Sequence, residues 1–84
     1  MKTIISEQRA KLNISKNVKR LMEANALTQM QLATKAAISQ PFVHKILYAK
    51  ILPNAVALRN VATALGVSSD ALINDPPKTG RKSS

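Results

Sequence analysis

The sequence contains no cysteine and no tryptophan, and it has only two glycines, one phenylalanine and one tyrosine among its 84 residues. Without cysteine the chain has no disulfide framework, no thiolate ligand for zinc and no cysteine nucleophile. With Phe42 and Tyr48 as the only aromatic residues, it lacks the stacking platforms typical of proteins that bind unpaired bases. The single histidine, His44, has no cysteine or carboxylate at ligand spacing, so the sequence predicts no metal site and no cofactor.

Long apolar runs are absent as well. No uninterrupted apolar stretch exceeds four residues, which is too short for a membrane span, and residues 1–12 lack the apolar stretch of a signal peptide. The few, scattered carboxylates offer neither a nucleophile–base pair nor a two-metal site. We therefore expect a soluble, cytoplasmic protein that is not an enzyme and has no catalytic residues.

Negative charge is scarce. Thirteen lysines and arginines against four aspartates and glutamates give a formal net charge of +9, and no carboxylate occurs between Ala24 and Ser69. Such a field attracts polyanions and accelerates their encounter with the protein. Charge alone does not distinguish DNA from RNA or from an anionic membrane surface.

The apolar spacing is helical, and no stretch alternates as a β-strand would. Thr28 and Gln31 have the spacing of a capping box, which marks the best-defined helix start in the chain. Gly66 is placed to end a helix in the left-handed conformation. The expected fold is all-α and compact, with five helices: roughly Lys16–Asn25, Gln29–Ala36, a third capped by Ser39 or Gln40, a fourth capped by Asn54, and a short fifth capped by Ser68 or Ser69.

The chain divides into three parts on these signals. Residues 14–75 form the helical domain. Residues 1–13 are expected to be a basic arm or a short extra helix, because their apolar stripe is thin. Residues 76–84 begin with Pro76–Pro77 and are expected to be a flexible basic tail or linker that contains Lys78, Arg81 and Lys82.

The second and third helices are separated by only three residues, as in a helix-turn-helix unit. Val18–Ile73 resembles the phage repressor and Cro family, through LTQMQLATKAAIS at Leu27–Ser39, QPFVHKI at Gln40–Ile46 and ALRNVATALGVSSDALI at Ala57–Ile73. The resemblance implies that the third helix enters the major groove of DNA. The polar face of this helix consists of Gln40, Pro41, His44, Lys45 and Tyr48. It offers hydrogen-bonding groups and contains no carboxylate.

The resemblance also implies roles by position. Gln40 matches a glutamine that reads adenine, and an amide offers the donor and acceptor that adenine requires. Gln29 resembles a glutamine that contacts a phosphate and supports a side chain of the recognition helix. The expected base contacts are Gln40, Pro41, His44 and Lys45, and the expected phosphate contacts are Gln29, Tyr48, Lys50, Asn54 and Lys19. For His44 a phosphate contact or plain exposure, and for Tyr48 packing at the rim, are left open. Leu72 and Ile73 are expected either at a dimer interface, as in the family, or in the core of the monomer.

Two single positions and one pair of positions depart from the family pattern. Ala37 and Ala49 stand where the family usually has glycine with positive φ, which costs about 1–2 kcal/mol per residue if the left-handed conformation is kept. Met22 and Leu47 replace a buried Arg–Glu pair, so we predict a direct apolar contact between them.

The function expected from these observations is a sequence-specific regulator that binds double-stranded DNA in the bacterial cytoplasm or nucleoid. It would be a phage or bacterial repressor that binds a near-palindromic operator as a homodimer. An antitoxin or restriction-control protein of the same fold, with a toxin as protein partner, is the alternative. A module that docks on anionic membranes is disfavoured by the acid-free face of the third helix, so we expect no membrane partner.

Overall fold

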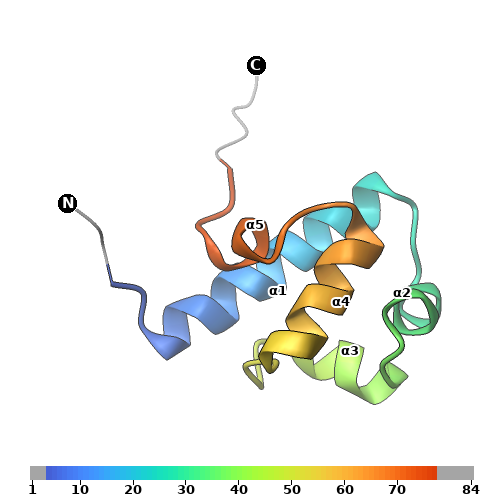
Figure 1. Cartoon of the computed structure of the whole chain (residues 1–84), viewed down its shortest axis with the longest axis horizontal. Helices are drawn as coiled ribbons and strands as arrows, with labels where there is room; N and C mark the ends of the chain where they lie inside the picture. Colours follow the sequence, from blue (N-terminus) through green and yellow to red (C-terminus); the bar gives the residue numbers. More distant parts are fainter. Residues whose placement is uncertain (1–3, 78–84) are drawn as a thin grey trace.

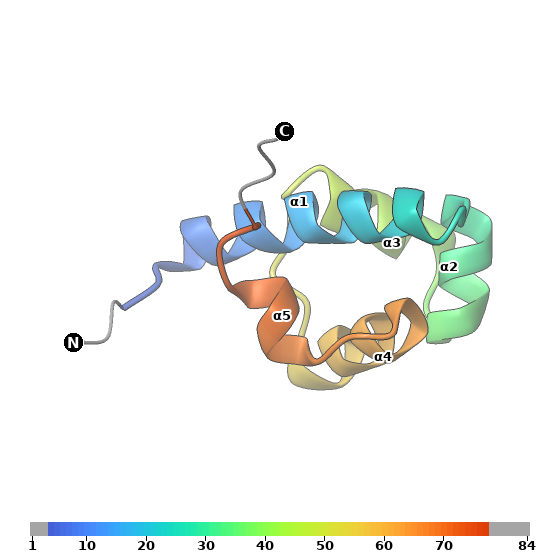
Figure 2. The same ribbon diagram turned by 90° about the horizontal axis from the view of Figure 1, so that it is seen from above.

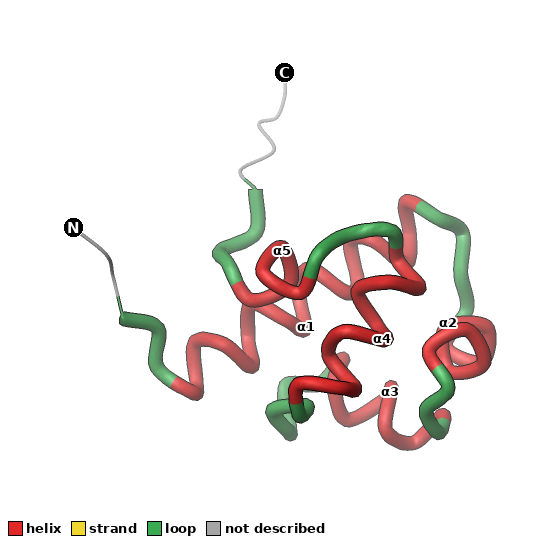
Figure 3. Tube along the Cα trace, in the orientation of Figure 1, coloured by secondary structure: helices red, strands yellow, loops and turns green. Residues whose placement is uncertain are grey.

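The computed structural model describes residues 4–77, and within that range helices are the only regular secondary structure, joined by loops (Figure 3). Its five helices are α1 (Glu7–Ala24), α2 (Gln29–Ala36), α3 (Gln40–Leu47), α4 (Ala55–Leu65) and α5 (Ser69–Ile73). The expected all-α, five-helix fold is therefore confirmed. None of the helices in this range is both long and apolar enough to cross a membrane.

The helices pack around one shared core. α2 packs against α3 and α4, while α1 packs against α3 and α5, and α4 also contacts α5 (Figure 1). In Figure 2, α1 runs along one side of the molecule and α4 lies on the opposite side, with α2 at one end. Every helix contributes at least one completely or almost completely buried apolar side chain, among them Ile14, Val18, Leu32, Val43, Ile46, Val61 and Leu72.

Side chains cap the start of every helix. Thr28 Oγ1 accepts from the backbone N–H of Gln31 at 3.1 Å, and Gln31 Oε1 accepts from the N–H of Thr28 at 2.9 Å. This is the predicted capping box, in which two otherwise unpaired N–H groups are satisfied reciprocally. The remaining N-cap residues are Ser6, Ser39, Asn54 and Ser68. Gly66 ends α4 with φ of +78°, as the sequence indicates.

The prediction that the first helix begins near Lys16 is wrong, because α1 begins nine residues earlier, at Glu7. Ser6 caps the helix by accepting from the N–H of Arg9 at 3.1 Å. The inward side of the added turns carries Ala10, Asn13 and Ile14, all buried. Asparagine in that stripe hides its apolar pattern, which is why the sequence does not indicate the full length of the helix.

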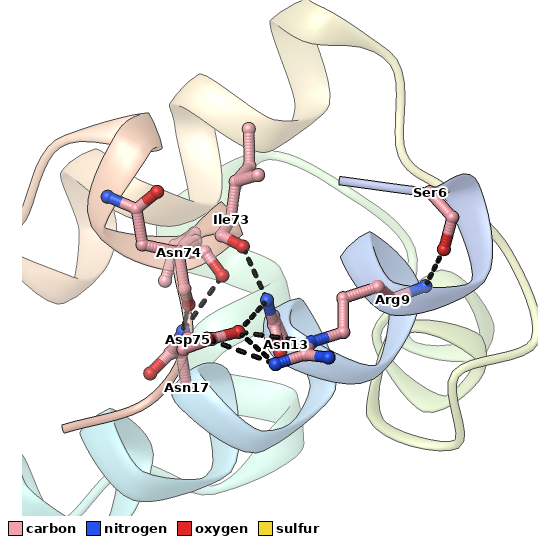
Figure 4. A network of polar contacts seen from close by, with 8 residues as sticks. Ser6, Arg9, Asn13, Asn17, Ile73, Asn74 and Asp75 are labelled. Carbon is pink, nitrogen blue, oxygen red and sulfur yellow. Dashed lines mark hydrogen bonds and ion pairs between the residues drawn. The ribbon is translucent and has the colours of Figure 1, made fainter. Parts of the chain in front are cut away.

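Two buried asparagines of α1 hold the end of α5 (Figure 4). Asn13 Nδ2 donates to the carbonyl of Ile73 at 2.8 Å, and Asn17 Nδ2 donates to the carbonyls of Leu72 and Asn74, both at 2.9 Å. These bonds satisfy carbonyls at the C-terminal end of α5 that have no partner within the helix. The bond to Asn74 also holds the start of the segment after α5 against α1. The basic residues expected in the tail, Lys78, Arg81 and Lys82, lie outside the described residues, as does Lys2.

Three alanines adopt the left-handed conformation. Ala37 has φ of +58° and Ala49 has φ of +57°, so the turns before and after α3 keep the geometry that the family usually builds with glycine. Ala26, between α1 and α2, has φ of +54°, which the sequence did not suggest. Each position stores strain of about 1–2 kcal/mol.

Candidate nucleic-acid interface

Helix α3 has one buried and one exposed side. Val43, Ile46 and Leu47 are buried in the core and anchor the helix. Ser39 caps the helix by accepting from the N–H of Phe42 at 3.1 Å, and a proline occupies the first turn, where a missing N–H costs nothing. The side chains that the sequence assigned to base contacts are all exposed: Gln40, Pro41, His44 and Lys45.

The first turns of α2 and α3 meet at a shallow hollow. Gln29, the first residue of α2, is half-buried and lines this hollow together with Gln40, Pro41 and His44. The hollow has a volume of about 290 Å³. The turn between the two helices thus brings Gln29 to the same hollow as side chains of α3, and the family resemblance implies that Gln29 supports one side chain of this helix.

The Tyr48 ring makes two contacts beside this hollow, one with His44 and one with Lys19. The rings of His44 on α3 and of Tyr48, the residue that caps the C-terminal end of α3, have centroids 4.3 Å apart and planes inclined by 29°. From α1, the Lys19 ammonium lies 5.7 Å from the centroid of the Tyr48 ring, within range of a cation–π interaction. The predicted phosphate contacts Lys19 and Tyr48 therefore lie together with the predicted base contact His44.

The remaining predicted phosphate contacts follow α3. Lys50 and Asn54 are both exposed. Asn54 Oδ1 caps α4 by accepting from the N–H of Ala57 at 2.8 Å, which leaves its side-chain NH₂ group outside the cap. Amide and ammonium donors at this end of α3 are suited to phosphate oxygens.

The segment of the chain that contains α3 carries charge of one sign only. Lys35, Lys45, Lys50 and Arg59 lie between residues 24 and 69, where the sequence has no carboxylate, and all four are exposed. An exposed helix that carries a lysine and no carboxylate, within a basic segment, is electrostatically complementary to the negatively charged DNA backbone.

The prediction that Leu72 lies in a dimer interface is wrong. Leu72 has no exposed surface, because it is enclosed by the core where α5 packs on α1 and α4. Ile73 packs at the margin of this core and is only partly buried. For Leu72, the alternative of a place in the core of the monomer is confirmed. Met22 and Leu47, the expected apolar replacement pair, are both buried in the same core cluster.

One residue that positions α3 was missed by sequence reasoning. The hydroxyl of Ser15, buried in α1, donates to the backbone carbonyl of Leu47 at the last turn of α3. The bond ties the C-terminal end of the exposed helix to α1 and satisfies a carbonyl that the helix leaves unpaired. A serine among the inward-facing residues of a helix indicates that its hydroxyl has a buried hydrogen-bond partner. The sequence does not identify that partner, because Leu47 lies 32 positions away.

Comparisons with known proteins agree on the architecture. The family model described as a helix-turn-helix domain matches residues 16–75. The crystal structure of a hypothetical transcription factor from Neisseria superimposes with a TM-score of 0.78 at 18% sequence identity, over 90% of this chain and 85% of that one. No curated protein matches the sequence.

Proposed function

The chain belongs to the helix-turn-helix DNA-binding family, and from this premise we propose that it is a sequence-specific transcriptional repressor. It would bind a near-palindromic operator with α3 in the major groove and would act by occluding RNA polymerase. That mechanism needs no catalytic group.

The observation that carries this proposal is the exposed side of α3. Gln40, His44 and Lys45 offer donors and acceptors at helical spacing, and the whole surrounding segment lacks carboxylates. A major groove about 12 Å wide admits one α-helix, and base edges there present the donor and acceptor patterns that amide, imidazole and ammonium groups can bind. The placement of Gln29 beside Gln40 supports a role in orienting the Gln40 amide.

The proposal includes a dimer on DNA, in which two copies of α3 reach successive major grooves about 34 Å apart. Its support is the partial exposure of Ile73, since Leu72 has no surface left for a partner. A duplex that carries one half-site is expected to bind one copy weakly, while a full operator binds two copies with cooperativity. Cooperativity that persists in an Ile73→Ser variant would exclude this residue from the contact.

The experiment that tests the proposal is the selection of bound sequences from a random duplex pool. A two-fold symmetric motif is expected, with half-site centres about 10–10.5 base pairs apart. The selected duplex then serves to compare the wild type with Gln40→Ala. We expect a loss of about 1–3 kcal/mol on the operator and little change on a scrambled duplex.

Gln8→Ala is the matched control, because Gln8 is another exposed glutamine, located in the first turn of α1. It should leave binding to both duplexes unchanged. Enrichment of no motif would overturn the proposal of a sequence-specific regulator. Equal losses for Gln40→Ala on both duplexes would remove Gln40 from base recognition.

A further inference from the structure

His44 is held on one side by its neighbours in the free protein. Its imidazole stacks on the Tyr48 ring at a centroid distance of 4.3 Å, while Lys19 from α1 lies over the Tyr48 ring at 5.7 Å. His44 also lines the hollow that contains Gln40 and Gln29. The imidazole thus lies between an aromatic support and the side chains expected to face the bases.

This arrangement restricts a side chain that would otherwise rotate freely. An exposed histidine at a helix surface has several accessible rotamers, and ordering such a side chain on binding costs affinity. Because the ring stack already orders the His44 side chain in the free protein, less conformational entropy is lost when the protein binds DNA. The Lys19 ammonium favours the same position of Tyr48, because its charge is attracted to the face of the ring.

On the basis of the proposed function, we infer that Tyr48 and Lys19 are positioning residues that hold the His44 imidazole for readout of one base pair. The imidazole N–H is a donor, and the acceptors that the major groove offers it are N7 of either purine, O6 of guanine and O4 of thymine. His44 makes the base contact, whereas Tyr48 acts through its ring.

Phosphate contact and positioning of His44 are two different roles for Tyr48, and they predict different effects of its replacement. If Tyr48 served only as a phosphate contact, its hydroxyl would matter and its effect would be the same on every DNA sequence. If it positions His44, its ring matters and its effect is confined to the base pair that His44 reads. Tyr48 is 59% exposed, so its replacement leaves the core intact.

The stack can be tested first without DNA. His44 is the only histidine of the chain, so its imidazole C–H signals are directly identifiable by NMR. We expect ring-current shifts of these signals in the wild type and in Tyr48→Phe, which keeps an aromatic ring. Tyr48→Leu should move the signals to the positions of an unstacked histidine. Unchanged His44 signals in Tyr48→Leu would overturn the inference.

The specificity test uses the selected operator and its single-base-pair variants. His44→Ala identifies the base pair that His44 reads. Tyr48→Leu should lower discrimination at that same pair by about three- to tenfold, with other positions unchanged, and Tyr48→Phe should retain it. The double variant His44→Ala with Tyr48→Leu should lose no more discrimination there than His44→Ala alone. Circular dichroism and thermal unfolding of each variant verify that the fold is preserved.

Lys19→Ala is expected to reduce discrimination at the same pair, in addition to any general loss of affinity. Lys16→Ala is its matched control, because Lys16 is exposed on the same helix and carries the same charge. Equal, sequence-independent losses in Tyr48→Leu and Tyr48→Phe would assign Tyr48 to phosphate contact and overturn the inference. The proposed function would still stand if Gln40→Ala relaxes specificity in the same assay, and it would fall if no variant of α3 does so or if the selection enriches no motif.

Discussion

Arg9 and Asp75 join the two ends of the described structure through a bidentate contact. Arg9 Nε donates to Asp75 Oδ1 at 3.1 Å, and Arg9 Nη2 donates to Oδ2 at 3.0 Å, across 66 positions of the chain. Asn13 Nδ2 adds a third donor to Oδ1 at 3.0 Å (Figure 4). Both ionic partners are exposed, so the ion pair contributes little to the free energy of unfolding. Its main effect is to hold the first turns of α1 beside the segment that follows α5.

The contact predicts a pH dependence of stability. The hydrogen bond from Asn13, followed by that from Arg9, holds the pKa of Asp75 below its usual value in the folded protein. A depressed carboxyl pKa contributes stability above the unfolded pKa, at about pH 4, and this contribution is lost as the pH falls through the folded pKa. The difference in unfolding free energy between the wild type and Asp75→Asn should therefore shrink between pH 6 and pH 2.

Asp70→Asn is the control for this measurement, because it removes a carboxylate from the same end of the chain without removing a bond to Arg9 or Asn13. Denaturant titrations at several pH values give the comparison. A gap between the wild type and Asp75→Asn that stays constant across this range would show that the carboxylate does not ionise differently in the folded state.

The core predicts the outcome of placing a charge at Leu47. Leu47 is 5% exposed on the inward side of α3, in the same cluster as Met22. Leu47→Glu leaves a carboxylate buried without a partner and should cost about 3–5 kcal/mol of unfolding free energy. Leu47→Met conserves volume and should cost less than about 1.5 kcal/mol. A change below about 1 kcal/mol for Leu47→Glu would contradict the expected contact with Met22.

The left-handed alanines predict stabilising substitutions. Glycine relieves the strain of about 1–2 kcal/mol at Ala26, Ala37 or Ala49. The greater conformational entropy of the unfolded glycine chain cancels about 0.4–1 kcal/mol of this stabilisation. Each alanine-to-glycine substitution should therefore leave stability unchanged or raise it by up to about 1.6 kcal/mol. Ala24→Gly, inside the last turn of α1, should instead lower stability by about 0.5–1 kcal/mol. Thermal unfolding of these variants distinguishes the two kinds of position.

Local signals allowed most of the fold to be predicted. The starts of α2, α3 and α4 were identified because the N-cap residues Thr28, Ser39 and Asn54 bond within three residues of themselves. The end of α4 was identified because Gly66 has an intrinsic preference for its conformation. The exposed side of α3 followed from the helical spacing of Val43, Ile46 and Leu47.

The features that were not predicted depend on partners distant in the sequence. The early start of α1 is stabilised by bonds from Asn13 and Asn17 to carbonyls 55–60 positions away. The burial of Leu72 depends on how α5 is seated between α1 and α4. The stack of Lys19 on Tyr48 depends on the packing of α1 against α3, for which neither helix carries a local signal.

The two lysines around α3 provide the last prediction, because they are expected to act on DNA in different ways. Lys45 lies within α3 beside His44, on the side proposed to face the bases, whereas Lys50 follows the helix. Lys50→Ala should weaken binding equally on all sequences and reduce the slope of log K against log salt concentration by about 0.9, the value for one phosphate contact. Lys45→Ala should instead lower discrimination at one base pair, by about 1–3 kcal/mol, and affect non-specific binding less. Titrations of the selected operator and of a scrambled duplex at several salt concentrations measure both quantities. The same sequence-independent loss and the same change of slope in both variants would place Lys45 on the backbone, and base readout by α3 would then depend on the other expected base contacts, Gln40, Pro41 and His44.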